Sequence, residues 1–235
     1  MTDVDTRVTP SLHVMNVHEM EDYDDETAPF LGQVETAFST AYEGLRNIHD
    51  AREAAKRNPT WNEAQAVIQT SDYASKVMLG ITKTFDSAEA NLAKAVTALE
   101  AQLSAPVTSK AAHAVSAEIR SYVKNLKASE RMTFLQKAIE SGDETTASAV
   151  LGGPSYLSGL DGEMQGVLTR MYHERISPKE AKRVRAMKAA QELMSRNAGL
   201  LFGQVEKAVG MPPARVHALR QAKTESEQAF ILKDS

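Results

Sequence analysis

The chain has 235 residues, enough for one large or two small domains, and its 31 acidic and 27 basic residues give a net charge of -4. It contains no cysteine, which excludes disulfides, thiolate catalysis and cysteine-ligated zinc. No run of about 18 apolar residues occurs, so we expect no membrane span.

The N-terminal segment, residues 1–28, is strongly acidic. Its first 27 residues hold eight acids and a single base, Arg7, without helical periodicity. This composition predicts an extended or disordered arm. The segment also holds five apolar residues, Leu12, Val14, Met15, Val17 and Met20. Two interpretations stay open: a flexible tail, or a segment that docks on a partner or on the chain's own basic half.

Residues 29–105 are expected to form a long antiparallel helical hairpin that turns at Asn58-Pro59. A helix from Pro29 to about Arg57 is predicted by small and apolar residues at heptad spacing, namely Val34, Ala37, Ala41, Gly44, Ile48, Ala51 and Ala55. Thr60 and Glu63 form the capping-box pattern at the start of the second helix, which continues to Leu103. The small residues predict that the two helix axes lie close together.

The second helix of the hairpin, residues 61–103, carries an apolar seam. It consists of every seventh residue from Ala64 and the positions three further on, and ten of these twelve residues are apolar. Such a repeat is typical of coiled-coil-like packing. The candidate packing residues are Met78, Ile81, Phe85, Leu92 and Leu99. The seam fits either the core of an intramolecular bundle or an intermolecular coiled coil.

The remainder of the chain also has helical periodicity. Residues 106–159 predict short helices that end at a glycine- and proline-rich break, residues 152–159, and residues 160–235 predict a basic helical C-terminal region. No segment alternates with a period of two over a convincing length. We therefore predict an all-α protein, an elongated helical bundle with a long coiled-coil-like hairpin.

No catalytic, cofactor or metal site is predicted. The six histidines never recur at a spacing of three or four residues, and no His-Glu-x-x-His motif occurs. The cluster Tyr172-His173-Glu174 resembles an acid/base group, but adjacent helical residues point about 100° apart and would not converge. The glycine-rich break lacks the lysine and hydroxyl residue that end a P-loop.

Basic residues are concentrated in the C-terminal region. Residues 170–223 hold twelve bases against four acids. This excess fits a solvated basic face, or contact with nucleic acid or with an acidic partner surface. The candidate contact residues are Arg183, Arg185, Lys188, Arg215, His217 and Arg220.

Within this region residues 202–221, FGQVEKAVGMPPARVHALRQ, resemble a helix-turn-helix. The resemblance makes Gly210 the turn glycine and places Arg215, His217 and Arg220 on the recognition helix. Glu206 departs from the pattern, which usually has a small residue there. The resemblance implies a DNA-binding protein as the alternative function.

Residues 141–160, SGDETTASAVLGGPSYLSGL, together with the basic helix after them, resemble segments of small helical virion proteins of tailed bacteriophages. Some of those proteins are internal or ejected with the genome. The resemblance implies a structural part in the virion, or in the host cytoplasm before assembly, with no functional residues to transfer. We therefore expect a non-enzymatic assembly protein without a cofactor, a homo-oligomer whose partners are other proteins of a large assembly.

Overall fold

The protein is all-α, as predicted. In this computed structural model residues 5–230, which the structure describes, are 79% helical and contain no strand. The helices are η1 (Pro10–Leu12), α1 (Met15–His18), α2 (Ala28–Lys56), α3 (Glu63–Leu103), α4 (His113–Asn125), α5 (Ala128–Ser141), α6 (Glu144–Leu151), α7 (Ser155–Ser158), α8 (Gly162–Ile176), α9 (Pro178–Ala198), α10 (Leu200–Val209) and α11 (Pro213–Gln228).

The chain folds into two compact units. Unit 1 combines residues 1–93 with residues 186–235, and unit 2 comprises residues 94–185. Helices α3 and α9 each contribute to both units. These units differ from the domains predicted from the sequence, whose boundaries lie near residues 105 and 160.

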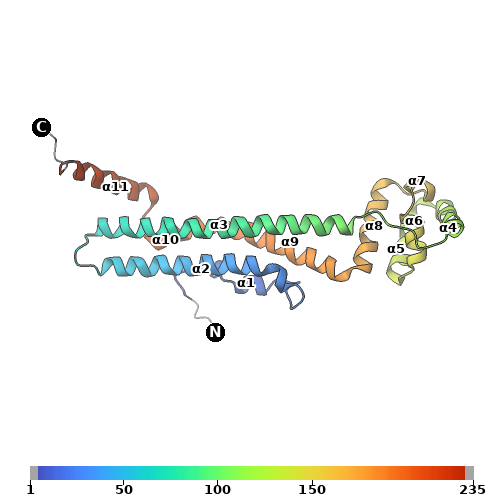
Figure 1. The fold of residues 1–235 in the computed structure, drawn as a ribbon, viewed down its shortest axis with the longest axis horizontal. Helices are drawn as coiled ribbons and strands as arrows, with labels where there is room; N and C mark the ends of the chain where they lie inside the picture. The colour runs from blue at the N-terminus through green and yellow to red at the C-terminus, as the bar shows by residue number, and fades with distance from the viewer. Residues whose placement is uncertain (1–4, 231–235) are drawn as a thin grey trace. The chain divides into compact units, whose positions relative to one another are not determined.

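In unit 1, α2 and α3 pack side by side as an antiparallel pair (Figure 1). Near the start of α2, Asn91 donates a hydrogen bond to Gln33 over 2.7 Å. Further along α2, the ring centroids of Phe38 and Phe85 lie 5.6 Å apart. As the residue number rises along α2, the contacted residue number falls along α3, which establishes the antiparallel direction.

The two helices approach each other closely at Gly44. A Cβ atom placed there would lie 2.8 Å from Val77 Cγ1 and 3.0 Å from Ile81 Cδ1. The buried stripe of α2 contains most of the heptad residues identified in the sequence, together with Leu31, Phe38, Tyr42 and Leu45. Small residues therefore bring the axes together, as the sequence predicts.

The predicted seam of α3 keeps its register from Ala74 to Leu92. Ile81, Phe85 and Leu92 are buried, while Met78 and Leu99 are half-buried. Beyond Leu92 the buried residues are Val96 and Leu103, one residue later than a strict heptad requires. Ile81, Leu92 and Leu103 thus repeat every 11 residues, an average of about 3.67 residues per turn rather than the 3.5 of a heptad.

The helix start predicted at Thr60 is displaced by two residues. Helix α3 begins at Glu63, and the Asn62 side chain caps it by accepting a hydrogen bond from the Gln65 amide over 2.8 Å. Thr60 instead donates its hydroxyl to Asn58 Oδ1 over 2.8 Å. Asparagine is at least as good an N-cap as threonine. Asn62 therefore caps the helix in place of Thr60, two residues after the predicted start.

The acidic segment does not form the extended arm expected from its sequence. Between residues 5 and 27, Val8, Leu12 and Val17 are buried, and η1 packs against α2. The Asp5 amide donates to the Tyr42 hydroxyl over 2.7 Å. The segment thus folds onto α2 of its own chain and buries three of its apolar residues, whereas Met15 stays exposed.

The acidic segment is also attached to α2 by charges. Arg7 pairs with both Asp5 and Asp50, the latter at 2.7 Å, and Arg46 lies 3.9 Å from Asp5. Hydrogen bonding from Arg7 holds the pKa of Asp5 well below its usual range. A hydrogen bond to Glu35, in turn, raises the pKa of Tyr23 to about 12.

Unit 2 is a bundle of short helices around its own core. Helices α4, α5, α6 and α8 contribute side chains to a cluster comprising Val107, Val123, Leu135, Ile139, Ala147, Val150, Leu151, Leu160, Leu168 and Tyr172. A smaller cluster joins Leu103 at the end of α3 to Ala181 and Val184 of α9. Local capping defines these helices: Gly142 ends α5 with φ +78°, and Asp143 caps α6.

The glycine-rich break at residues 152–159 lies inside unit 2 rather than between two units. Gln165 of α8 donates to the carbonyls of Leu151 and Gly153, over 3.1 Å and 2.9 Å. A Cβ on Gly152 would lie 2.8 Å from the Ser109 amide nitrogen. The absence of a side chain on Gly152 therefore permits a tight backbone contact within one core. The segment that the sequence predicts as a domain boundary is a turn inside unit 2.

The contact at Gly44 predicts opposite effects for two glycine substitutions in α2. Gly44→Ala should lower the free energy of unfolding by about 1–2 kcal/mol, because overpacking costs more than the helix propensity that alanine adds. Gly32 has no atom within 4 Å of its Cβ position, so Gly32→Ala should raise stability by up to about 1 kcal/mol. Urea unfolding of both variants tests this, and equal shifts would contradict the close contact.

The ion pairs of Asp5 predict a pH-dependent stability. Because the folded pKa of Asp5 is depressed, its contribution is present above the unfolded pKa near 3.8 and is lost as the pH falls below it. Asp5→Asn should therefore lower the urea midpoint at pH 6, and the difference from the parent should shrink below about pH 4. Asp25→Asn, at an exposed acid of the same segment, should leave the midpoint nearly unchanged at both pH values.

Candidate functional site

An apolar groove of about 610 Å³ lies on unit 1 between α3, α10 and α11. Its apolar lining consists of Ala74, Met78, Leu79, Phe202, Val205, Val209, Met211, Pro213 and Val216. Two of these side chains are largely in water: Leu79 is 73% exposed and Phe202 is 72% exposed. Large apolar side chains exposed around a concave surface are typical of an interaction site.

The groove is lined by one face of each of the three helices α3, α10 and α11. On α10 the lining residues are Phe202, Val205, Glu206 and Val209, spaced by three or four residues, so they share one face. The lining residues of α3, from Ser71 to Thr82, follow the same spacing. Helix α11 adds Val216 and Arg220. The groove is therefore lined by regular helices, which hold its side chains in a fixed geometry.

The turn between α10 and α11 is fixed by Gly210 and Arg52. Gly210 has φ +79°, a backbone conformation that favours glycine, and a Cβ there would overlap the Arg52 guanidinium. Arg52 also donates to the carbonyl of Lys207 over 3.5 Å. A cation at a helix C-terminus is favoured by the helix dipole. This arrangement attaches the end of α10 to α2 and sets where α11 begins.

Arg220 fixes α11 against α3. Its guanidinium pairs with Asp72 and donates to the Ser71 hydroxyl over 3.1 Å. The two other predicted contact residues on α11, Arg215 and His217, are exposed. The helix thus presents Arg215 and His217 to solvent, while Arg220 is used within unit 1.

The predicted basic residues of α9 do not all lie on one face of the helix. Arg183 is half-buried and lies 3.9 Å from Glu180, whereas Arg185 and Lys188 are exposed. Positions two residues apart on a helix do not face each other, so Arg183 and Arg185 diverge. Arg183 and Arg185 belong to unit 2, and the other four predicted contact residues belong to unit 1.

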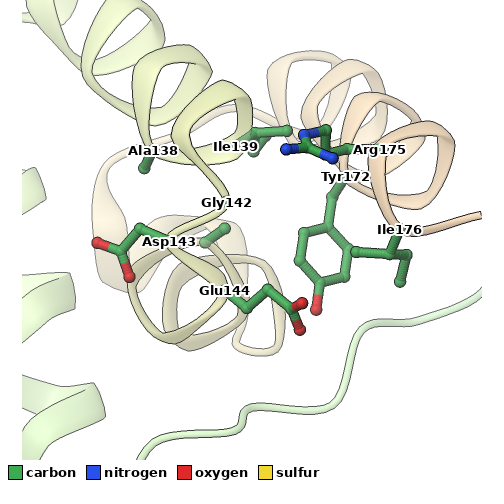
Figure 2. A pocket seen from close by; sticks show the side chains of 9 residues that line it. Ala138, Ile139, Gly142, Asp143, Glu144, Tyr172, Arg175 and Ile176 are labelled. Atoms are coloured by element: carbon green, nitrogen blue, oxygen red, sulfur yellow. The ribbon is translucent and has the colours of Figure 1, made fainter.

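A second hollow, of about 400 Å³, lies in unit 2 between α5, α6 and α8 (Figure 2). Tyr172 is buried, and its hydroxyl points toward the Glu144 carboxylate. Burial raises the pKa of Tyr172, so at neutral pH the hydroxyl is protonated. Glu144 pairs with Lys110, and Asp143 accepts the Thr146 amide over 3.0 Å. These carboxylates hold α6 in place and do not form an acid/base pair.

The cluster Tyr172-His173-Glu174 separates into three unrelated contacts. Tyr172 enters the core of unit 2, whereas His173 Nε2 lies 2.8 Å from the Ala105 carbonyl oxygen and Glu174 pairs with Arg170 at 2.7 Å. Adjacent residues on a helix point in different directions, as expected. Tyr172 and His173 therefore attach α8 to different neighbours, and Glu174 forms an ion pair within α8 itself.

Sequence reasoning missed Leu79 and Phe202, the two large apolar groove residues that are mostly exposed. Leu79 follows Met78 directly and lies one residue outside the heptad seam, and Phe202 lies at the start of the helix-turn-helix-like segment without a predicted role. The signal that could have identified them is an apolar residue outside the buried stripe of an amphipathic helix, which indicates an exposed contact surface.

Among residues 5–230, no group of three or more histidine or acidic side chains is placed to bind a metal ion. Nor does any helix in this range combine the length and apolarity needed to cross a bilayer. No protein-family model, curated protein or solved structure matches the chain. The case for a function therefore depends on the geometry of the two units themselves.

Proposed function

We propose that this chain is a non-enzymatic assembly protein whose groove on unit 1 binds an apolar segment of another protein molecule, in the first place another copy of the chain. The observation that carries the proposal is the pair Leu79 and Phe202, which lie in water beside the other apolar residues that line the groove. Covering them removes apolar surface from water, which favours association.

The expected strength follows from the size of this surface. Burying one large apolar side chain contributes about 1.5–3 kcal/mol, so Leu79 and Phe202 together contribute about 3–6 kcal/mol. Association costs about 4–15 kcal/mol, because the molecules lose translational and rotational freedom and their interface side chains become ordered. Further groove residues such as Met78 and Val205 must therefore contribute. We expect a reversible, concentration-dependent contact. In an assembly, many such contacts acting together bind more tightly than a single one.

The assembly we propose is a bacteriophage particle. The support is the resemblance of residues 141–160 to segments of virion proteins. In the structure these residues form α6, α7 and the turns around them, which belong to the core of unit 2. Under this proposal unit 2 is a folded structural module, and the chain acts through contacts with neighbouring proteins.

The groove proposal predicts how two substitutions change the association of the chain. Light scattering should give a mass above 25.6 kDa that rises with concentration. Leu79→Asp or Phe202→Asp should weaken the association at least tenfold, because a carboxylate would be desolvated in the contact. Both residues are exposed, so the helical circular dichroism should be unchanged.

Tyr156→Asp provides the matched control. Tyr156 is an exposed aromatic residue of unit 2 outside the groove, and its substitution should leave the mass unchanged. Association that is insensitive to both groove substitutions would rule out this surface as the contact.

A second candidate function is DNA binding by α10 and α11. The observation that favours it is the exposure of Arg215 and His217 on the helix that follows the Gly210 turn. Exposed cations on one helix can contact phosphates, and such contacts make affinity fall steeply with salt.

This alternative predicts a measurable salt dependence. If α11 contacts phosphates, fluorescence anisotropy should show duplex DNA binding that weakens strongly between about 50 and 200 mM salt. Arg215→Ala should then weaken binding and reduce the salt slope by about one. Arg196→Ala, at an exposed arginine of α9, is the control. Binding that is absent, or that is equally affected by both substitutions, would eliminate α11 as a DNA contact.

A further inference from the structure

The far end of α11 is exposed and ends at an aromatic residue. Helix α11 contacts the rest of unit 1 through Val216 and Arg220 in its first half, whereas every residue from 224 to 230 is exposed. Phe230, directly after the helix, is 83% exposed. Figure 1 shows this end of α11 clear of α3. An aromatic residue at the tip of a helix without packing on its own chain is a suitable anchor for a second molecule.

Phe230 cannot occupy the groove of its own chain in this conformation. Arg220 is the last residue of α11 that lines the groove, and Phe230 lies ten residues further along. At about 1.5 Å per helical residue this separation is roughly 15 Å, directed away from the groove. The Arg220–Asp72 pair fixes the base of the helix, so the tip is held beyond the groove's edge.

We propose that the Phe230 end of α11 from a second copy occupies the groove between α3, α10 and α11. This inference rests on the proposed function and names the occupant of the same groove. Phe230 is followed in the sequence by Ile231 and Leu232, which lie outside the described residues. Together they provide three consecutive large apolar side chains for a groove that Leu79, Phe202 and the two methionines line.

The chemistry of the two surfaces is complementary. Met78 and Met211 give the groove flexible, polarizable side chains that adapt to an aromatic ring. Glu206 is exposed at its rim, and Lys233, three residues after Phe230, offers the opposite charge. One chain thus carries both an acceptor groove and a donor end, which suits it to join copies.

Light scattering of the full-length chain tests the donor end. Phe230→Ser should weaken association at least tenfold and leave helical circular dichroism unchanged. The matched control, Tyr156→Ser, replaces another exposed aromatic residue and should retain the parental mass. Parental association of the Phe230→Ser chain would overturn the inference.

Mixing two variants tests whether the donor and the groove meet between molecules. Phe230→Ser keeps an intact groove without its anchor, and Phe202→Asp keeps the anchor with a damaged groove. Each variant alone should remain near 25.6 kDa at concentrations where the parent associates. An equimolar mixture should recover a species of twice that mass, because one productive donor–groove pair is restored. A mixture that stays monomeric would overturn the exchange between copies.

The outcomes separate this inference from the proposed function. If the groove substitutions abolish association and Phe230→Ser does not, the groove is an assembly site and its occupant is a different surface. If the parent chain remains at 25.6 kDa up to high concentration, self-association fails and the inference fails with it.

Discussion

The close approach of α2 and α3 at Gly44 is the constraint on which unit 1 depends. With Val77 and Ile81 lying against the glycine backbone, the facing sides of both helices are filled. Further elements must then pack on other faces of the pair. The acidic segment and α10 both pack against α2, so α2 is covered on several sides. Helix α3, in contrast, keeps Leu79 in water, and the groove forms where α10 and α11 pass beside that residue.

The acidic segment shows why charge distribution along a sequence is a poor guide to contacts in space. Asp5 pairs with Arg7 and lies near Arg46, and Tyr23 bonds to Glu35, all within the segment or α2. Asp5 and Glu35 are therefore used locally, and Val8, Leu12 and Val17 of the segment are buried. A contrast between an acidic beginning and a basic end thus gives no reason to connect them.

The sequence predicted most of the fold but little of the candidate site. Heptad positions identified the buried stripe of α2 and the central residues Ile81, Phe85 and Leu92, because burial of one helix face imposes that spacing on the residues themselves. The groove follows from which helices meet, and no local pattern encodes that. Leu79 is exposed for the same reason that Met78 is half-buried: they lie about 100° apart on one helix.

Two local contacts determine what the α10–α11 segment can do. Arg52 at Gly210 sets the end of α10, and Asp72 holds Arg220 one turn beyond Val216. Were α11 loosely attached, its tip would remain close to its own groove, and the high local concentration would favour an intramolecular contact. Because the base of α11 is fixed and the helix is regular through Gln228, Phe230 is carried away from that groove. The same contacts that shape the groove therefore direct its complementary end toward another molecule.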